Sequence, residues 1–255
     1  MCTQIRMQRR RPVLLLDVDG VILDNNLSAR EWDRLAPLAF GKLLGGDPAA
    51  WSSAQDRAWC FVEQRANHRL SELPRRQWPS PEDWWRDANA DWIVELCAIV
   101  GAHVPATLEQ RVAAAEWALT AYFGGTRAIF PGVREAVRVL ANQYEIHMAS
   151  GNHSIAVDCH LKNVGVRAFV GQPYGTDLLG AYKGDATFYD VIASSIGRDP
   201  SEVVVVDDTP WCIENASAIG AKTVIVGQRC ESADLAVESL AELPLAVERI
   251  DFREW

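Results

Sequence analysis

The chain has 255 residues, a formal net charge of -9 at pH 7 and 49% hydrophobic residues. This length is enough for one large domain or two modest ones, each with a buried core, and the composition is that of an ordinary globular protein. The negative charge argues against nucleic acid or an anionic membrane as the main partner, because phosphates are repelled at long range, so a small anionic substrate would need a local source of positive charge.

Five short apolar segments rich in β-branched residues are predicted to be buried strands. They are Val13–Asp17, Glu145–Ala149, Arg167–Val170, Val203–Asp207 and Thr223–Val226. Helical patterns alternate with them over Pro131–Leu140, over Asp185–Ile196 and from Thr209 to Gly220. Because strands and helices alternate and the strands are apolar throughout, we expect an α/β fold with a parallel sheet between two layers of helices.

The interval from about Ser28 to Phe123 has helix signals and no convincing strand. Capping-box patterns start at Ser28 and at Thr107, and Ser80-Pro81 is a cap followed by a first-turn proline. One apolar stripe with helical spacing consists of Leu108, Val112, Ala115, Leu119 and Tyr122. This predicts an all-helical domain at residues 25–126, inserted into an α/β core at residues 12–24 and 127–255.

Tryptophan is concentrated in the predicted helical insert, which holds eight of the ten tryptophans in the chain. Large aromatic side chains at helical spacing usually form the core of a helix bundle, and we expect this of most of them. The alternative is that one or two line a substrate pocket. Both interpretations are open at the level of sequence.

The six cysteines are scattered without a C-x-x-C pair, in a chain too large to need disulfide bonds, which predicts reduced thiols in a cytoplasmic protein. Arginines near the N-terminus are followed by an apolar run over 13–16, which is too short for the core of a signal peptide. No run approaches the roughly 20 apolar residues of a transmembrane helix. We therefore expect no association with a membrane.

Two aspartates, Asp17 and Asp19, stand at the end of the first predicted strand, where open α/β sheets bind ligands. A calcium loop of the EF-hand type is excluded, because its sixth and twelfth positions are Ile22 and Ser28. A purely structural turn is possible, since Asp and Gly favour turns. The third interpretation is a magnesium-dependent phosphoryl site, in which a cation neutralises the two carboxylates and further donors meet the phosphoryl group.

The rest of the chain contains the groups that such a phosphoryl site requires. The second predicted strand ends in Ser150-Gly151-Asn152, which offers a hydroxyl and backbone amides to phosphate oxygens. Lys183 follows just ahead of a helix, and the strand at 203–207 ends in Asp207-Asp208. If these strand ends lie side by side, oxygen ligands converge in the way that Mg²⁺ prefers.

These motifs, in this order, resemble those of the haloacid dehalogenase superfamily of aspartate-nucleophile phosphatases. The resemblance covers about residues 12–23 and 129–226 and implies a three-layer, Rossmann-like core with a helical cap of the first type inserted after the first strand. Two positions depart from the family pattern: Val21 replaces the commoner Thr, and Gly184 follows the lysine where Pro is frequent. The second departure puts the form of the lysine loop in doubt, but not its charge.

The resemblance implies catalytic roles for Asp17, Asp19 and Lys183. Asp17 would be the nucleophile that forms an aspartyl-phosphate, and Asp19 would protonate the leaving alcohol and then activate water. Lys183 would offset negative charge near the phosphoryl oxygens. Ser150, with its neighbours Gly151 and Asn152, would bind the phosphoryl group.

The resemblance also implies a metal site. Mg²⁺ would be held by the Asp17 carboxylate, the backbone carbonyl of Asp19 and Asp208, with Asp207 aiding directly or through water. Asp208 is favoured over Asp207 as the direct ligand, because family members usually ligate through the second acid of this pair.

We therefore expect a Mg²⁺-dependent phosphatase that hydrolyses a small phosphorylated metabolite under a closing cap. Asp19 favours phosphate-ester chemistry, because family members that cleave carbon–halogen bonds lack an acid at this position. A phosphomutase on the same scaffold and a non-catalytic phosphate-binding protein are the alternatives. The sequence does not indicate the oligomeric state or which metabolite is the substrate.

Overall fold

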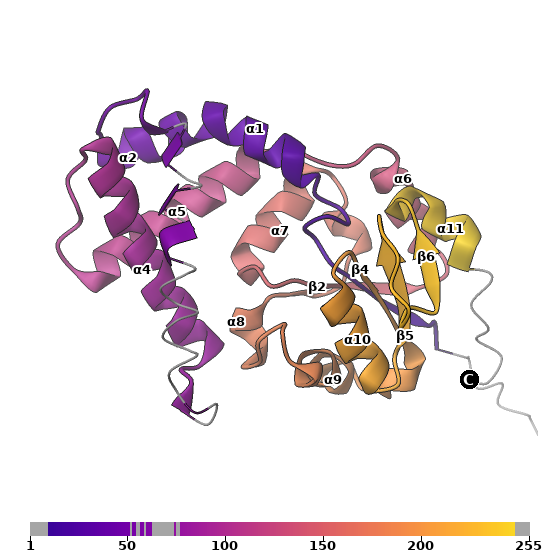
Figure 1. Ribbon diagram of the computed structural model, residues 1–255. Coiled ribbons are helices and arrows are strands. Elements are labelled where there is room, and N and C mark those ends of the chain that lie inside the picture. The colour runs from indigo at the N-terminus through magenta and orange to yellow at the C-terminus, as the bar shows by residue number, and fades with distance from the viewer. Residues whose placement is uncertain are drawn as a thin grey trace, which may run out of the picture.

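The computed structural model describes residues 10–51, 53–54, 57–58, 60–62, 74 and 77–247. Figure 1 shows a helical part, formed by the first half of the chain, beside an α/β part that contains the sheet. Within the described residues, no helix is both long enough and apolar enough to cross a membrane. None of the five described cysteines forms a disulfide bond within the described part of the chain.

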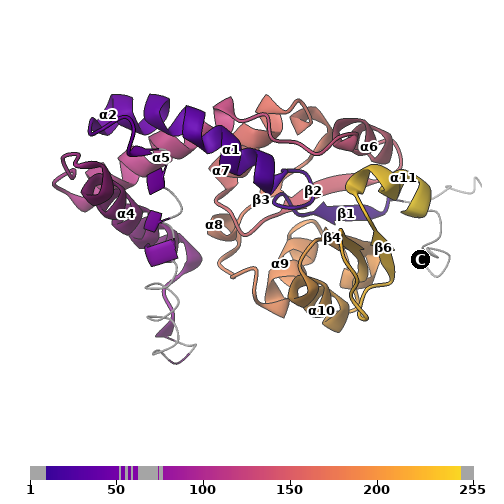
Figure 2. The same ribbon diagram turned by 45° about the horizontal axis from the view of Figure 1, so that its top comes forward.

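One sheet of six parallel strands forms the centre of the α/β part, in the order β3-β2-β1-β4-β5-β6 (Figure 2). The strands are β1 (Val13–Leu16), β2 (Glu145–Ala149), β3 (Pro173–Tyr174), β4 (Val203–Asp207), β5 (Lys222–Val226) and β6 (Leu235–Val237). In the register of β1 with its neighbours, Leu16 lies between Met148 and Val206. The chain fills one side of β1 first and then the other, so the order reverses between β1 and β4, where open α/β sheets bind ligands.

Helices cover both faces of this sheet. One face packs against α6, α7 and α11, and the other against α9 and α10. Their bounds are α6 (Val133–Leu140), α7 (Ser154–Asn163), α8 (Thr176–Leu179), α9 (Ala186–Ser195), α10 (Pro210–Ala218) and α11 (Leu243–Ala246). Single 3₁₀ turns cover Arg167–Phe169, Pro200–Glu202 and Leu240–Glu242. The expected three-layer α/β fold is therefore confirmed.

Four of the five predicted strands are confirmed, with ends that differ by one residue at most. The strand predicted at Arg167–Val170 is wrong, because Arg167–Phe169 forms a 3₁₀ turn and the strand comes later, at Pro173–Tyr174. The Arg167 guanidinium holds this turn by donating to the Asp158 carboxylate at 2.5 Å and to the Val170 carbonyl at 2.6 Å. The edge strand β6 was not predicted, because three residues are too short to show a periodic pattern.

The helical part consists of α1 (Asn25–Ala36), a π-helical turn (Pro37–Gly41), α2 (Lys42–Leu44), α4 (Pro81–Val100) and α5 (Leu108–Gly125). These elements share a hydrophobic core whose buried members lie between residues 32 and 122, separate from the two cores of the sheet. We refer to this part as the cap and to the α/β part as the core domain. The separation supports the predicted division of the chain, whose boundaries at 24/25 and 126/127 stay a prediction.

Two of the three predicted helix starts in the cap are confirmed. Ser80 caps α4 by accepting from the Asp83 amide, and Thr107 forms the expected capping box with Gln110. The capping box predicted at Ser28 is wrong, since α1 begins three residues earlier with Asp24 as its N-cap. The Ser28 hydroxyl lies instead at 2.5 Å from the Tyr122 hydroxyl, a tertiary contact that no local pattern reveals.

Aromatic rings form the centre of the cap. The Trp32 ring lies 4.9 Å from the Tyr122 ring and 5.4 Å from the Phe40 ring between centroids, and Trp51 stacks on Phe40. Trp32, Trp51 and Trp92 are buried, so the bundle-core interpretation is confirmed for them. It is wrong for Trp117, which is 43% exposed. Trp59 lies outside the described residues.

The stripe predicted along α5 is partly wrong. Ala115 and Tyr122 are buried as expected, but Leu108 is exposed, and the buried face runs through Ala114 and Ala118. These small side chains let α4 and α5 approach closely, because two helices pack nearer to each other where their contact residues are small. Side-chain size therefore decided the buried face, rather than hydrophobicity alone.

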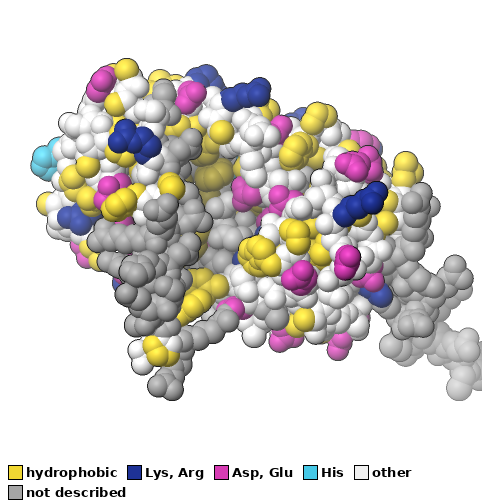
Figure 3. All heavy atoms as spheres, viewed as in Figure 1, with side chains coloured by type: hydrophobic (Ala, Val, Ile, Leu, Met, Phe, Trp, Pro, Cys, Tyr) yellow, Lys and Arg dark blue, Asp and Glu magenta, His cyan; other side chains and the backbone are white. Residues whose placement is uncertain are grey.

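Among the described residues, α5 of the cap packs against α7 of the core domain, and hydrogen bonds join the two parts at either end of the interface. Near the chain crossings, the Glu31 carboxylate accepts from the Arg127 amide at 2.6 Å and from the Thr126 hydroxyl. At the opposite end, the Trp85 indole N–H donates to the Thr176 hydroxyl at 2.6 Å. Between these contacts Figure 3 shows a hollow, with hydrophobic side chains in its cap wall and acidic side chains on the core-domain side.

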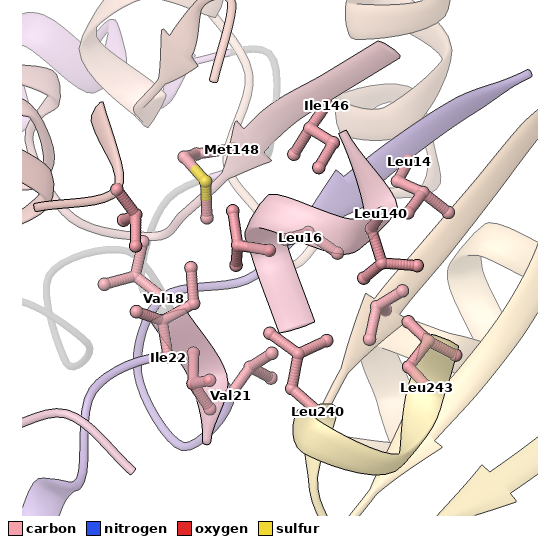
Figure 4. Close-up of a cluster of buried hydrophobic side chains, with 14 of the residues drawn as sticks. Leu14, Leu16, Val18, Val21, Ile22, Leu140, Ile146, Met148, Leu240 and Leu243 are labelled. Atoms are coloured by element: carbon pink, nitrogen blue, oxygen red, sulfur yellow. The ribbon is translucent and has the colours of Figure 1, made fainter. Parts of the chain in front are cut away.

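Strand β1 is buried on both faces. Leu14 and Leu16 face the cluster that includes Leu140 of α6 and Leu243 of α11 (Figure 4). Val13 and Leu15 belong to the cluster on the opposite face of the sheet. All four side chains of β1 are fully buried, and burial of each contributes roughly 2 kcal/mol to folding. This packing anchors the strand whose end carries Asp17.

His160 in α7 is a buried titratable side chain next to the cap. Its side chain is fully buried, its ring lies 6.4 Å from the Phe123 ring, and neither ring nitrogen has a hydrogen-bond partner among the described residues. Burial lowers the pKa of His160 to about 4, although the charge of Glu31 opposes this. The folded protein therefore holds this histidine neutral at pH values where an unfolded chain would protonate it.

We expect His160 to make the folded state less stable as the pH falls from 6.5 toward 4. In this window the unfolded chain binds a proton that the folded chain does not, so the free energy of unfolding decreases by up to about 3 kcal/mol. Urea unfolding at pH 7 and pH 4.5 should show a smaller loss for His160→Leu than for the wild type. The exposed His103→Leu should behave like the wild type, and an equal loss in all three proteins would contradict the prediction.

Candidate active site

The end of β1 leads directly into a tight turn that carries Asp17 and Asp19. The Asp17 amide donates to the Val206 carbonyl at 2.9 Å, which extends the pairing with β4 by one residue. The Ile22 and Leu23 amides both donate to the Val18 carbonyl, at 2.9 and 2.8 Å. This turn closes on itself and keeps both aspartates next to β4.

Three carboxylates gather where β1 and β4 end. Oxygens of Asp17, Asp207 and Asp208 all lie within 4.8 Å of one another. Asp17 is 4% exposed and Asp207 is 1% exposed. Parallel pairing brings them together, because adjacent parallel strands end at the same edge of a sheet. Three residues separated by up to about 190 positions in sequence thus form one acidic cluster.

Lys183 supplies the positive charge in this cluster. Its Nζ atom lies 2.6 Å from Asp17 Oδ1 and 2.9 Å from Asp207 Oδ2. Burial alone would lower the pKa of Lys183, but the charges of Asp17 and Asp207 outweigh it and raise this pKa above its ordinary value. Lys183 is therefore a permanent cation and a local source of positive charge in a protein of net negative charge.

The single positive charge of Lys183 does not neutralise the several carboxylates around it. Burial raises the pKa of Asp17 well above its ordinary value against the opposing charge of Lys183, and Asp207 and Asp19 raise it further. Burial raises the pKa of Asp19 to about 6, again against Lys183 and with Asp208 adding to the rise. Buried like charges at this spacing favour a bound cation, which lowers such pKa values.

The turn leaves room for Asp208 only because residue 20 is a glycine. A Cβ atom on Gly20 would lie 1.9 Å from Asp208 Oδ2, and the φ of +76° also disfavours any other residue there. The Asp208 carboxylate therefore packs against the bare backbone of the turn that carries Asp17 and Asp19. Converging carboxylate oxygens with one side free of side-chain atoms fit a hard divalent cation such as Mg²⁺.

The loop after β2 lies beside Asp19 and Lys183. Ser150 is fully buried, and its hydroxyl accepts from the Asn152 amide at 3.1 Å. The Asn152 side chain donates to Asp19 Oδ2 at 2.5 Å. A Cβ atom on Gly151 would lie 3.6 Å from the Lys183 side chain. The structure therefore places all the site residues expected from the sequence at one edge of the sheet.

Several residues support this site that sequence reasoning missed. The Tyr189 hydroxyl donates to Asp207 Oδ2 at 3.2 Å. Asp177 accepts from the Ser154 amide at 2.8 Å and from its hydroxyl at 2.6 Å, which secures the start of α7 next to the loop after β2. Tyr189 lies in a helix where it looks like an ordinary core residue, so no local signal could have identified it.

A cavity of about 280 Å³ opens next to Asp19, between the cap and the core domain. Asp19, Asn152 and His153 contribute to its core-domain wall. Trp32, Trp85 and Trp92 contribute to its cap wall, so some tryptophans serve both the bundle and a pocket. His153 also caps α7, where its ring accepts from the Ile155 amide at 3.3 Å.

A family model for haloacid dehalogenase-like hydrolases matches residues 12–220. The comparison with curated proteins gave no match. The L-2-haloacid dehalogenase from Xanthobacter autotrophicus is similar in structure, with 14% identity and a TM-score of 0.63 over 95% of this chain and 100% of that one.

Two further solved structures share the fold at similarly low identity. The 2-haloacid dehalogenase from Pseudomonas syringae pv. Tomato DC3000 has 15% identity and a TM-score of 0.61, over 94% of this chain and 99% of its own. The putative HAD-hydrolase YfnB from Bacillus subtilis, bound to magnesium, has 16% identity and a TM-score of 0.61, over 92% and 97%. Because the family model spans most of the chain and these structures share its fold, the protein belongs to the haloacid dehalogenase-like hydrolases.

Proposed function

We propose that this protein is a Mg²⁺-dependent phosphatase that hydrolyses a small phosphomonoester through an aspartyl-phosphate intermediate. The observation that carries this proposal is the cluster of buried Asp17 and Asp207 with half-buried Asp208, in which Lys183 pairs with Asp17 and Asp207 and Asp19 lies alongside. This set combines a nucleophile, a cation site and an acid, which together are what phosphoryl transfer requires.

In the proposed reaction, a carboxylate oxygen of Asp17 attacks phosphorus and the bond to the leaving oxygen breaks. Lys183, at 2.6 Å from Asp17, holds that carboxylate in place and attracts the phosphoryl oxygens. Asp17, Asp208 and the Asp19 carbonyl would hold Mg²⁺, with Asp207 acting directly or through water. When bound, the ion neutralises charge on the carboxylates and on the transferred group.

Asp19 handles the protons in both halves of this reaction. It gives a proton to the leaving alcohol oxygen as the ester bond breaks, and it later takes one from the water that attacks the aspartyl-phosphate. The Asn152 side-chain Nδ2 donates to Asp19 Oδ2 at 2.5 Å and so fixes the direction of the carboxyl group. Release of inorganic phosphate regenerates Asp17.

The loop after β2 would bind the phosphoryl oxygens that face away from Asp17. Ser150 offers its hydroxyl, and the Gly151 backbone offers an amide with no bulky side chain beside it. The Asn152 backbone amide already donates to the Ser150 hydroxyl at 3.1 Å, which keeps this loop closed around Ser150. The proximity of Gly151 to Lys183 supports this assignment, because both groups then reach the same transferred group.

Carbon–halogen hydrolysis is the second candidate, because dehalogenases share the whole fold with this chain. In that reaction an aspartate displaces a halide ion, which needs no proton and develops no phosphoryl charge. Asp19 and the acidic cluster would then have no role. Phosphate-ester hydrolysis uses both, so the arrangement of this site favours it.

The proposal is tested by supplying both substrate classes to the purified protein. We expect phosphate release from an aryl phosphate and from simple alkyl phosphates with Mg²⁺, and at least about a tenfold loss of rate when EDTA removes the ion. Chloropropionic acid should release no chloride. Chloride release without phosphate release would establish the dehalogenase, and isomerisation of a sugar phosphate without net phosphate release would establish a mutase. No turnover of any ester would support a phosphate-binding protein.

Asp19→Asn tests the proton transfer to the leaving group on which the proposed phosphatase reaction depends. Loss of the acid should lower kcat for alkyl phosphates by about 100-fold, and by less for an aryl phosphate, whose leaving group needs little protonation. An equal effect on both ester types would contradict the role of Asp19 as the acid for the leaving group.

A further inference from the structure

The cavity beside Asp19 receives the leaving group if the proposed function is correct, because Asp19 protonates the leaving oxygen. The inference below therefore rests on that function. The cavity of about 280 Å³ has space for roughly nine water molecules at about 30 Å³ each, which suits a group of about ten non-hydrogen atoms. Figure 3 shows the hollow from the open side, between the cap and the core domain.

Aromatic side chains make up a substantial part of the walls of this cavity. One third of its fifteen lining residues are aromatic, namely Trp32, Trp85, Trp92, Tyr122 and Phe123. The polar ends of two of these rings are already in use, since the Trp85 N–H donates to Thr176 and the Tyr122 hydroxyl donates to the Ser28 carbonyl at 3.0 Å. Such rings offer apolar faces and edges to a ligand, which suits a flat group of similar character.

The charge of the cavity wall selects against an anionic leaving group. No Lys or Arg is among the described residues that line it, and Asp19 is its charged member. Among these described lining residues, a second phosphate or a carboxylate would lose its hydration, find no Lys or Arg to pair with and meet a like charge at Asp19. An uncharged group avoids all three costs.

Two lining residues carry buried polar atoms that the described chain leaves unpaired. The Trp32 indole N–H has no acceptor, and the Asn89 side-chain oxygen has no donor. Buried polar atoms without a partner are rare in folded proteins and destabilise them, so a partner supplied by a ligand is a physical reason for their presence. A ligand that satisfies both needs one acceptor and one donor.

We propose that the substrate is the phosphate ester of an uncharged, flat, ring-containing alcohol whose ring system carries a hydrogen-bond acceptor and a hydrogen-bond donor. The ring lies against the aromatic wall, its acceptor meets Trp32 and its donor meets Asn89. Trp32 and Asn89 are then specificity-determining residues of the cap, while the chemistry stays with the core domain.

The test uses three esters that differ only at the far end of the ring: benzyl phosphate, 4-carbamoylbenzyl phosphate and 4-carboxybenzyl phosphate. Their leaving alcohols are alike, so differences in kcat/KM report on the cavity. We expect 4-carbamoylbenzyl phosphate to be the best substrate and 4-carboxybenzyl phosphate to be at least about 100-fold poorer. Equal or better turnover of 4-carboxybenzyl phosphate, or of glycerol phosphate, would overturn the proposal.

The role of Asn89 is tested by Asn89→Leu. This change keeps a side chain of similar size but removes the acceptor, so the advantage of the carbamoyl ester over the benzyl ester should fall by about tenfold. Asn142→Leu makes the same chemical change on the surface of the core domain, far from the cavity lining, and should leave the advantage unchanged. An undiminished advantage in Asn89→Leu would exclude Asn89 as the acceptor.

A binding measurement separates this proposal from the proposed function. Tryptophan fluorescence of the wild-type protein should change on addition of 4-carbamoylbenzyl alcohol, and at least about 100-fold more 4-carboxybenzyl alcohol should be needed for the same change. Selective binding without hydrolysis of any ester would support the proposed ring-binding cavity and contradict the proposed phosphatase function. Hydrolysis of all three esters at equal rates, without selective binding, would support the proposed phosphatase function and contradict the proposed role of the cavity in selecting the ring.

Discussion

Replacing Asp17 by asparagine should lower kcat for phosphate-ester hydrolysis by about 10⁴-fold or more. The amide has the shape of the carboxylate but cannot attack phosphorus, and it cannot form the ion pair that joins Lys183 to Asp17 at 2.6 Å. Acid quenching during turnover of a phosphate ester with labelled phosphorus should trap label on the wild-type protein and none on the variant. Phosphate release by Asp17→Asn at a comparable rate would remove the covalent mechanism.

Loss of activity in Asp17→Asn should not come from unfolding. Burial and the neighbouring acids already raise the pKa of Asp17, so its charged form is unfavourable in the folded protein, and removal of that charge relieves repulsion in the cluster. We expect a melting temperature equal to or above that of the wild type in metal-free buffer. Asp158→Asn is the matched control, because Asp158 pairs with Lys162 and Arg167 away from the site and its loss should leave kcat unchanged.

The second large effect is expected from Gly20→Ala, a change of one methyl group. A Cβ atom there would lie 1.9 Å from Asp208 Oδ2, so either the turn that carries Asp17 and Asp19 or the Asp208 carboxylate must move. Displacement of the metal ligand Asp208 should weaken Mg²⁺ binding by about 10- to 100-fold. Displacement of the reacting groups Asp17 and Asp19 should slow the chemical step, and together the two effects should lower kcat/KM at limiting Mg²⁺ by about 10³-fold. Calorimetric titration with Mg²⁺ and steady-state kinetics measure the two components.

The matched control for Gly20→Ala is Gly197→Ala. Gly197 also has a positive φ, of +66°, but a Cβ atom on it would meet no atom within 4 Å. Both variants carry backbone strain of about 1 kcal/mol, whereas only Gly20→Ala disturbs Asp208. If both variants lost Mg²⁺ affinity equally, strain alone would explain the effect and the contact with Asp208 would have no part in it.

Local interactions explain why much of the fold could be predicted. The strands β1 and β4 are continuous apolar runs because both faces of the sheet are covered, and such runs are visible in the sequence. The helix starts at Ser80 and Thr107 rest on hydrogen bonds within three residues, so a short pattern contains the whole cause. The family resemblance, which the family model over residues 12–220 confirms, could also be found from the sequence. Its motifs are short and follow directly after strands, so each is visible as a local pattern.

Predictions failed where distant residues decide the conformation. Ser28 matches a capping box, but its hydroxyl pairs with Tyr122 from another helix, and the N-cap role goes to Asp24. The segment at Arg167–Val170 has the composition of a strand, yet the Arg167 side chain bonds to the Val170 carbonyl and to Asp158 and holds a turn. Tertiary contacts outweigh local preference in both cases, because each local preference amounts to only about 1 kcal/mol.

The sequence by itself determined the α/β order of the elements, the helical insert and the identity of the acids, the lysine and the loop that form the candidate site. Only the tertiary structure decided that Tyr189 bonds to Asp207, that Gly20 makes space for Asp208, and that cap tryptophans share a cavity with Asp19. Strand ends and helix caps are set by neighbours in the chain, which a pattern can show. A cavity is the space left between side chains from separate elements, so its shape and its unpaired polar atoms exist only once the whole chain has packed.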